Sequence, residues 1–239
     1  MKKVFVKTKN VKQLISMMNR LREREDGVPG MGLVYGEPGL GKTYAITWWA
    51  AQNDAILIRS ANLMSARWLL EEMVEELGEI PYNKFSDIFN QVVSQLIKTP
   101  RTIIVDETDY LTIDSRAVET LRDIHDKTNV PIVLVGMTSA NSRLKKFNHL
   151  YDRLSEIVKF EKFTKTDIKT IVQELSEIEM TECAIRYMYT NLNRFRQIVK
   201  VINKAEILAK ANGLSSIDEI LIKEAIANET EDAKTNQNS

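Results

Sequence analysis

Cysteine, net charge and long apolar runs are all scarce in this chain of 239 residues. It has one cysteine, and its 33 lysines and arginines balance 33 aspartates and glutamates. A lone cysteine excludes an internal disulfide and fits a reducing compartment, and we expect Cys183 to be a small core residue. Because the net charge is zero, any binding of nucleic acid must come from a local basic patch.

No stretch approaches the roughly 20 apolar residues that a membrane-spanning helix needs. Lysines at positions 2, 3, 7 and 9 also interrupt the N-terminal segment where a signal peptide would require an apolar run. We therefore expect a cytoplasmic protein with no membrane partner.

Short apolar runs alternate with helical patterns over the first two thirds of the chain. Strands are predicted at 31–35, 55–58, 102–105 and 131–135, with a last, shorter strand at 157–160, and an amphipathic helix at 11–25. Buried strands joined by helices predict an α/β fold with a parallel sheet flanked by helices.

The pattern changes after Phe163. Helices are predicted at 164–178, 181–191, 193–211 and 216–227, with no strand-like run between them. We expect an α/β nucleotide-binding domain at 1–162, a small all-helical lid domain at 163–227 and a disordered polar tail at 228–239.

A glycine-rich loop follows the first predicted strand and precedes a helix. It consists of Gly36, Glu37, Pro38, Gly39, Leu40, Gly41, Lys42 and Thr43. Glycines let backbone N–H groups converge on an anion at the positive end of the helix. Lys42 would contact the β- and γ-phosphates of ATP, and the Thr43 hydroxyl would ligate Mg²⁺. The motif therefore predicts a P-loop NTPase.

Asp106 and Glu107 end the strand predicted at 102–105. An aspartate at the tip of a parallel strand beside a phosphate loop can hold Mg²⁺, so Asp106 is a second candidate for the metal site. Glu107 is then placed to act as the general base toward the attacking water, which predicts an ATPase. We expect the nearby Asp109 to be solvated or to cap a helix.

The loop GEPGLGKT, the segments IIVDETDYL and IVLVGMTSA, and the helical C-terminal part together resemble the AAA+ ATPases over about residues 5–227. The resemblance implies that Thr138 senses the γ-phosphate, with Ser139 as the alternative. It also implies an arginine finger supplied by a neighbouring subunit, for which Arg153 is the first candidate and Arg143 the second.

Two further features follow from the same resemblance. The helical lid returns an arginine to the nucleotide, and of Arg194 and Arg196 the register favours Arg196. The adenine is expected near Val28 and Pro29, ahead of the first strand.

Within AAA+ proteins, the chain is similar to the transposition ATPases that include MuB, TniB and TnsC. The similarity rests on residues 8–11, the spacer 28–36, and Trp48 and Trp49. It implies an ATP-dependent helical or ring oligomer that assembles on double-stranded DNA without sequence preference and delivers the DNA to a transposase. Only a short helix precedes the first predicted strand, so we do not expect the helix-turn-helix domain that MuB carries. A replication helicase loader of the DnaC or IstB type, or another remodelling ATPase, is the alternative.

DNA binding would then depend on a few basic side chains per subunit, because weak phosphate contacts add up along a filament. The candidates that follow the second and fourth strands are Arg67, Arg143, Lys145 and Lys146. Since few aromatic residues lie near these clusters, a duplex is favoured over single strands.

Overall fold

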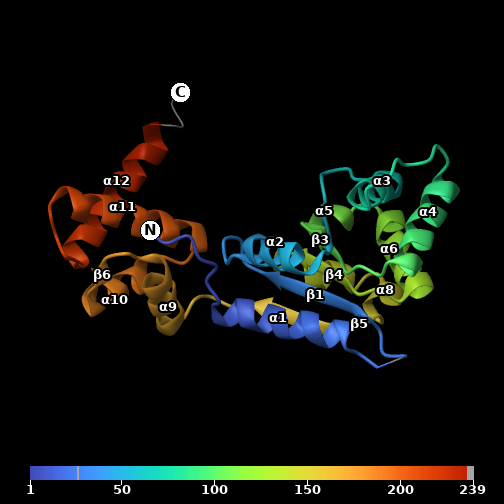
Figure 1. Cartoon of the computed structure of the whole chain (residues 1–239), viewed down its shortest axis with the longest axis horizontal. Coiled ribbons are helices and arrows are strands. Elements are labelled where there is room, and N and C mark those ends of the chain that lie inside the picture. Colours follow the sequence, from blue (N-terminus) through green and yellow to red (C-terminus); the bar gives the residue numbers. More distant parts are fainter. Residues whose placement is uncertain (26, 236–239) are drawn as a thin grey trace. The chain divides into compact units, whose positions relative to one another are not determined.

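The computed structural model describes residues 1–25 and 27–235, with side chains up to residue 227 (Figure 1). The chain divides into two compact units. We call the first the sheet unit, which comprises Asn10–Glu37 and Lys42–Phe160. The second, the helical unit, comprises Met1–Lys9, Pro38–Gly41 and the chain from Glu161 onward.

The sheet unit contains the parallel sheet. Its elements are α1 (Lys9–Arg22), β1 (Met31–Gly36), α2 (Lys42–Asn53), β2 (Ile56–Arg59), α3 (Ala66–Glu76), α4 (Phe85–Lys98), β3 (Ile103–Asp106), α5 (Thr108–Leu111), α6 (Ser115–Thr128), β4 (Ile132–Gly136), α7 (Ala140–Leu144), α8 (Asn148–Tyr151) and β5 (Leu154–Phe160). The strand order is β2-β3-β4-β1-β5, and every pairing is parallel. The predicted α/β sheet fold is therefore confirmed.

Because all strands run the same way, their carboxyl ends share one edge of the sheet. Gly36, Arg59, Asp106 and Gly136 are the last residues of β1 to β4. The loops that leave these positions carry most of the candidate site residues.

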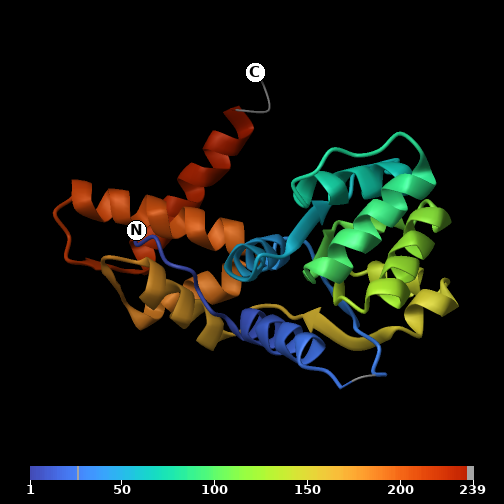
Figure 2. The same cartoon turned by 45° about the vertical axis from the view of Figure 1, so that its right-hand side comes forward.

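Buried aliphatic side chains hold helices on both faces of the sheet. On one face, strand residues such as Leu33, Ile103 and Leu134 form a single core with α3, α4 and α6, which Figures 1 and 2 show as neighbouring helices. On the other face, Gly32 lies against α1, since a Cβ there would be 2.8 Å from Leu21 Cδ1. Helices thus cover both faces of the sheet, and this packing holds the carboxyl ends of the strands in place.

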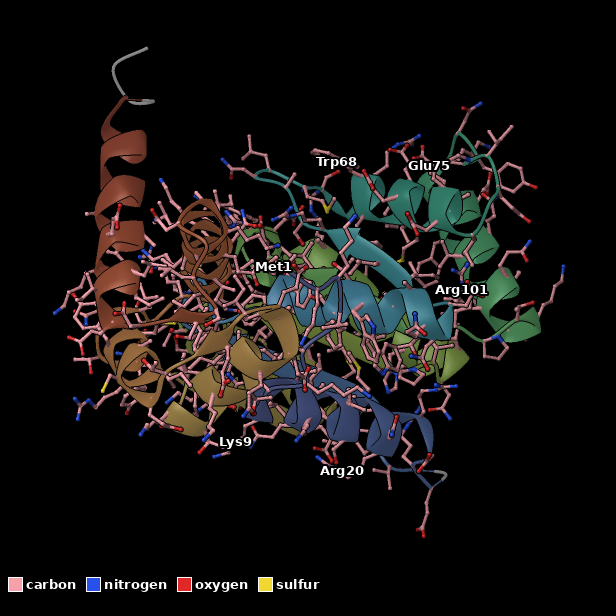
Figure 3. The ribbon with its side chains drawn as sticks, turned by 60° about the vertical axis from the view of Figure 1, so that its left-hand side comes forward. Met1, Lys9, Arg20, Trp68, Glu75 and Arg101 are labelled. Carbon is pink, nitrogen blue, oxygen red and sulfur yellow. The ribbon has the colours of Figure 1, made fainter. Side chains whose placement is uncertain are left out.

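Ion pairs at the rim join elements of the sheet unit. On α1, Arg20 pairs with Glu156 of β5 at 2.7 Å. Arg101 pairs with Asp54 at 2.9 Å and donates to the carbonyl of Glu76. Figure 3 labels Arg20 and Arg101 among the side chains. Exposed pairs of this kind contribute about 0–1 kcal/mol each. The core therefore contributes far more to stability than these contacts do.

Strand β5 differs from the prediction. It begins at Leu154 and not at Ile157, and its residues alternate between partly buried and exposed up to Phe160. The strand lies at the edge of the sheet and pairs only with β1, so Ser155 and Glu156 can be polar within it. A search for continuous apolar runs misses such a half-exposed edge strand.

The helical unit contains α9 (Lys165–Leu175), β6 (Glu179–Met180), α10 (Glu182–Asn191), α11 (Phe195–Ala211), β7 (Ser216–Ile217) and α12 (Glu219–Thr235). The expected helical C-terminal region is confirmed, but it is not free of strands, because β6 and β7 form a two-residue parallel pair. Two residues are too few to give a periodic pattern in the sequence. Thr164 caps α9 by accepting from the backbone N–H of Asp167, whose carboxylate accepts in return from that of Thr164.

Two other expectations fall in this unit. Cys183 is exposed, so the core assignment was wrong: α10 buries Ala184, Ile185 and Met188, which lie on another face of the helix. Helix α12 continues to Thr235, into the stretch expected to be a disordered tail, and 236–239 lie outside the described residues. Among the described helices, none is long and apolar enough to cross a membrane.

Candidate functional site

The phosphate loop joins the end of β1 to the start of α2. Gly39 and Gly41 have φ angles of +87° and +86°, which residues with a Cβ rarely adopt. At Gly36 a Cβ would approach the carbonyl oxygen of Phe160 to 2.7 Å. The loop conformation therefore requires these glycines.

Lys42 lies at the first turn of α2 with its ammonium group against the loop. Its Nζ donates to the carbonyls of Gly36 and Glu37 at 2.8 and 2.9 Å. Burial lowers the pKa of Lys42, and the nearby carboxylates of Asp106 and Asp109 oppose that shift. The loop thus holds a partly buried positive charge, which a polyphosphate would complement.

Thr43 and Asp106 meet at the end of β3. The Thr43 hydroxyl donates to Asp106 Oδ2 at 2.8 Å, and Asp106 Oδ1 accepts from the backbone N–H of Glu107 at 2.9 Å. Asp106 is only 4% exposed. A hydroxyl and a carboxylate are the oxygen ligands that Mg²⁺ takes beside phosphates and water, so this pair fits that ion.

Glu107 follows Asp106 in a left-handed conformation, with φ +56° and ψ +37°. Its carboxylate forms an ion pair with Arg59, the last residue of β2, at 2.7 Å. This contact raises the pKa of Arg59 and occupies the carboxylate expected to act as the base. No motif in the sequence indicated Arg59, although its alignment with Asp106 across the β2–β3 pair follows once the strand order is known.

Asp109 is neither solvated nor a cap of its own helix α5, so that expectation was wrong. It lies on α5 and is 8% exposed, with its carboxylate accepting from the backbone N–H of Met137 at 2.6 Å and from the Ser139 hydroxyl at 2.7 Å. The Arg143 guanidinium donates to the Asp109 carbonyl at 3.0 Å. Asp109 therefore connects the ends of β3 and β4.

The two candidates for the γ-phosphate sensor differ in their surroundings. Thr138 is exposed in the turn after β4. The Ser139 hydroxyl is engaged by Asp109 in the same turn. Of the two hydroxyls, that of Thr138 is therefore the more accessible to a ligand.

The candidate arginines have different partners. Arg153 pairs with Asp126 of α6 at 2.8 Å and donates to the His149 carbonyl at 3.0 Å. In the helical unit, a Cβ on Gly39 would be 2.8 Å from the Cγ of Arg194. Arg196 is exposed on α11. The structure thus places Arg194, and not Arg196, against a residue of the phosphate loop.

Val28 and Pro29 are not brought to the phosphate loop. They precede Met31, whereas the loop leaves the other end of β1. A six-residue strand spans about 20 Å. Val28 instead accepts from the Arg24 guanidinium through its carbonyl at 3.1 Å.

The basic candidates fall into two groups. Arg67 is on α3 and is engaged by Glu71 and by the Asn83 carbonyl. Lys145 and Lys146 are exposed at the end of α7, close to Arg143, and the Lys145 ammonium lies 5.9 Å from the centre of the Tyr151 ring. The groups follow β2 and β4, which β3 separates in the sheet.

Residues 7–144, more than half of the chain, match a protein family described as AAA domain. A Staphylococcus aureus protein named "Potential ATP-binding protein" is 22% identical over 237 residues, covering 82% of this chain and 86% of that protein.

Solved structures share the fold. The Aeropyrum pernix ORC2 protein, solved as ADPNP-ADP complexes, matches with a TM-score of 0.72 and 17% identity over 94% of this chain and 68% of its own. The Aeropyrum pernix ORC1 protein in complex with DNA matches with a TM-score of 0.63 and 13% identity over 95% and 66%.

Proposed function

The chain belongs to the AAA domain family, and on that premise we propose that it binds ATP with Mg²⁺, hydrolyses the γ-phosphate, and couples this cycle to binding of duplex DNA. The observation that carries the proposal is the bond from Thr43 to Asp106 at 2.8 Å, with Glu107 next in the chain. The ORC2 structure is of ADPNP-ADP complexes and the ORC1 structure is a complex with DNA, which supports the proposal.

The phosphate loop, residues 36–43, binds the triphosphate through its backbone N–H groups and Lys42. Thr43 and Asp106 would hold Mg²⁺, and the ion would neutralise charge on the phosphates. Glu107 orients a water molecule and accepts its proton during attack on the γ-phosphate. Thr138 contacts that phosphate and responds to its loss.

Arginines complete the proposed site. Arg153 from a neighbouring subunit stabilises the charge that develops in the transition state, with Arg143 as the alternative. From the helical unit, we propose Arg194 ahead of Arg196, because the stem of Arg194 lies against Gly39. A planar guanidinium suits contact with several phosphate oxygens at once.

DNA binding is assigned to Arg143, Lys145 and Lys146 near α7, with Arg67 as a secondary contact. These side chains are exposed while the whole chain is neutral, so one subunit alone binds weakly. An ATP-dependent oligomer would sum these contacts along the duplex.

Two clients are proposed. A transposase is supported by the similarity of residues 8–11 and 28–36 to transposition ATPases. A replicative helicase, with this chain as its loader, is the alternative, because the resemblance to AAA+ ATPases also includes loaders of the DnaC or IstB type. The two clients can be distinguished by experiment. A transposition ATPase should activate a transposase on duplex DNA, whereas a loader should place a helicase on single strands.

The primary test measures ATP turnover with and without duplex DNA, together with negative-stain microscopy in ATP, ADP and no nucleotide. We expect DNA to raise turnover, and ordered assemblies on DNA in ATP alone. Lys42→Ala is the control that should abolish both. If calorimetry with Mg²⁺ detects no binding of adenine nucleotide to the wild-type chain, the proposal is wrong.

A further inference from the structure

Asp109 is a buried carboxylate with no role assigned so far: it belongs neither to the phosphate loop nor to the pair formed by Asp106 and Glu107. It is a nearly fully buried carboxylate on α5, two residues after Glu107, and it accepts two hydrogen bonds from the turn that follows β4. Gly136 accommodates this contact, because a Cβ there would lie 2.7 Å from Asp109 Oδ2. The turn and α5 are therefore packed around this one carboxylate.

The turn held by Asp109 carries Thr138. The backbone N–H of Met137 and the hydroxyl of Ser139, one on each side of Thr138, donate to the two carboxylate oxygens at 2.6 and 2.7 Å. Thr138 itself is exposed between them. Fixing both neighbours fixes the direction of the Thr138 side chain relative to α5.

The same residue also contacts the proposed DNA-binding segment. Arg143 donates from α7 to the backbone carbonyl of Asp109 at 3.0 Å, and α7 directly follows the turn. A DNA phosphate that attracts the Arg143 guanidinium would compete with this carbonyl. Movement of α7 would then reach Thr138 and Glu107 through Asp109.

We propose that Asp109 is a positioning residue that transmits DNA binding at α7 to the hydrolysis centre, by clamping the Thr138 turn to the helix that follows Glu107. This inference rests on the proposed function. To that function it adds a structural route by which DNA binding accelerates ATP hydrolysis.

Two substitutions distinguish the effect of the two hydrogen bonds from the effect of the negative charge on Asp109. Asp109→Ala removes both hydrogen bonds, whereas Asp109→Asn can keep both: its carbonyl accepts from Met137 and its amide donates to the Ser139 hydroxyl. Asp123→Ala, which removes a partly exposed carboxylate on α6, is the matched control.

The experiment measures nucleotide affinity, kcat and KM for ATP with and without duplex DNA. For Asp109→Ala we expect affinity and KM within about threefold of wild type, but a DNA-stimulated kcat about a hundredfold lower, the loss that small misplacements of reacting groups produce. Asp109→Asn should recover most of the DNA stimulation. Hydrogen exchange should show the Met137 amide protected in wild type and in Asp109→Asn, but unprotected in Asp109→Ala at a temperature where that variant is still folded.

Full DNA stimulation in Asp109→Ala, with the Met137 amide unprotected, would overturn the clamp while leaving the proposed function intact. Loss of stimulation in both variants would also overturn it, because the charge and not the hydrogen bonds would then matter. If the wild-type chain hydrolyses no ATP with or without duplex DNA, the proposed function is wrong, and the proposed role of Asp109 is wrong with it.

Discussion

The ion pair between Arg59 and Glu107 sets the resting state of the proposed base. A guanidinium 2.7 Å from the carboxylate competes with the attacking water for the carboxylate oxygens. Substituting Arg59→Ala should therefore raise ATP turnover in the absence of DNA severalfold and reduce the further increase that DNA causes. Turnover assays on Arg59→Ala and Arg59→Lys check this, since lysine can keep the pair. Equal basal rates in all three proteins would contradict it.

A substitution at Glu107 should affect ATP hydrolysis but not ATP binding. Glu107→Gln removes the proton acceptor but keeps the size of the side chain, so ATP should still bind while turnover falls by about two to four orders of magnitude. Nucleotide titration and single-turnover hydrolysis measure the two effects. If the variant turns over ATP at the wild-type rate, another group is the base.

His125 gives the sheet unit a pH-dependent stability. The buried ring accepts from the Gly30 N–H at 3.2 Å through Nε2, and its Nδ1 lies 2.9 Å from the Val130 carbonyl. Burial lowers the pKa of His125, so the folded chain binds fewer protons than the unfolded chain below about pH 6.5. The free energy of unfolding should thus be highest above that pH and fall as the pH drops toward the folded pKa.

Denaturant unfolding at pH 7.5 and 5.5 tests this assignment. His125→Gln is the control, because it has no titrating ring and should lose less stability between the two pH values than wild type does. Parallel losses in both proteins would exclude His125 as the source.

At the scale of residues, the sequence predicted those site residues that lie next to one another in a motif. The glycines and Lys42 of the loop and the acidic pair could be located because each motif is contiguous. Arg59 and Asp109 could not, since their partners are 48 and 28 to 34 residues away and meet only through the strand order. Charged residues near a strand end look solvated until the neighbouring strand is known.

At the scale of elements, α7 should determine salt-dependent DNA binding. Substituting Lys145→Glu and Lys146→Glu together should abolish ATP-dependent retention on duplex DNA while ATP binding persists, because phosphate contacts turn repulsive. Milder Lys→Ala changes should weaken the salt dependence by about one unit of slope per lysine. Charge-matched changes at Lys84 and Lys98 of the α4 region should leave retention unchanged. Unaltered retention in the α7 variant would refute this interface.

The elements themselves were predictable to different degrees. Strands buried on both faces, such as β3 and β4, gave continuous apolar runs and were found within one or two residues. The edge strand β5 was found only in its second half, and β6 and β7 were missed. Burial on both faces is thus what made a strand recognisable.

For the whole molecule, the main prediction concerns assembly. If Arg153 acts in a neighbouring subunit, it must leave Asp126, its partner at 2.8 Å. Arg153→Ala should then bind ATP as a single chain but lose most of the hydrolysis that depends on assembly, by about three orders of magnitude or more. Asp126→Ala frees the same guanidinium and should retain hydrolysis.

Mixing variants provides a direct test of a shared site. Arg153→Ala chains keep their own Glu107, and Glu107→Gln chains can supply Arg153, so a mixture of the two inactive proteins should recover part of the activity. A mixture as inactive as its components would show that Arg153 does not act between subunits.

The exposed position of Cys183 on α10 has a practical consequence. It is the only cysteine in the sequence, so a thiol-reactive dye would attach at one place in the helical unit of the unaltered protein. Fluorescence anisotropy of that dye, or energy transfer to a second dye on a duplex, would show in real time whether the chain binds and leaves DNA as ATP is consumed.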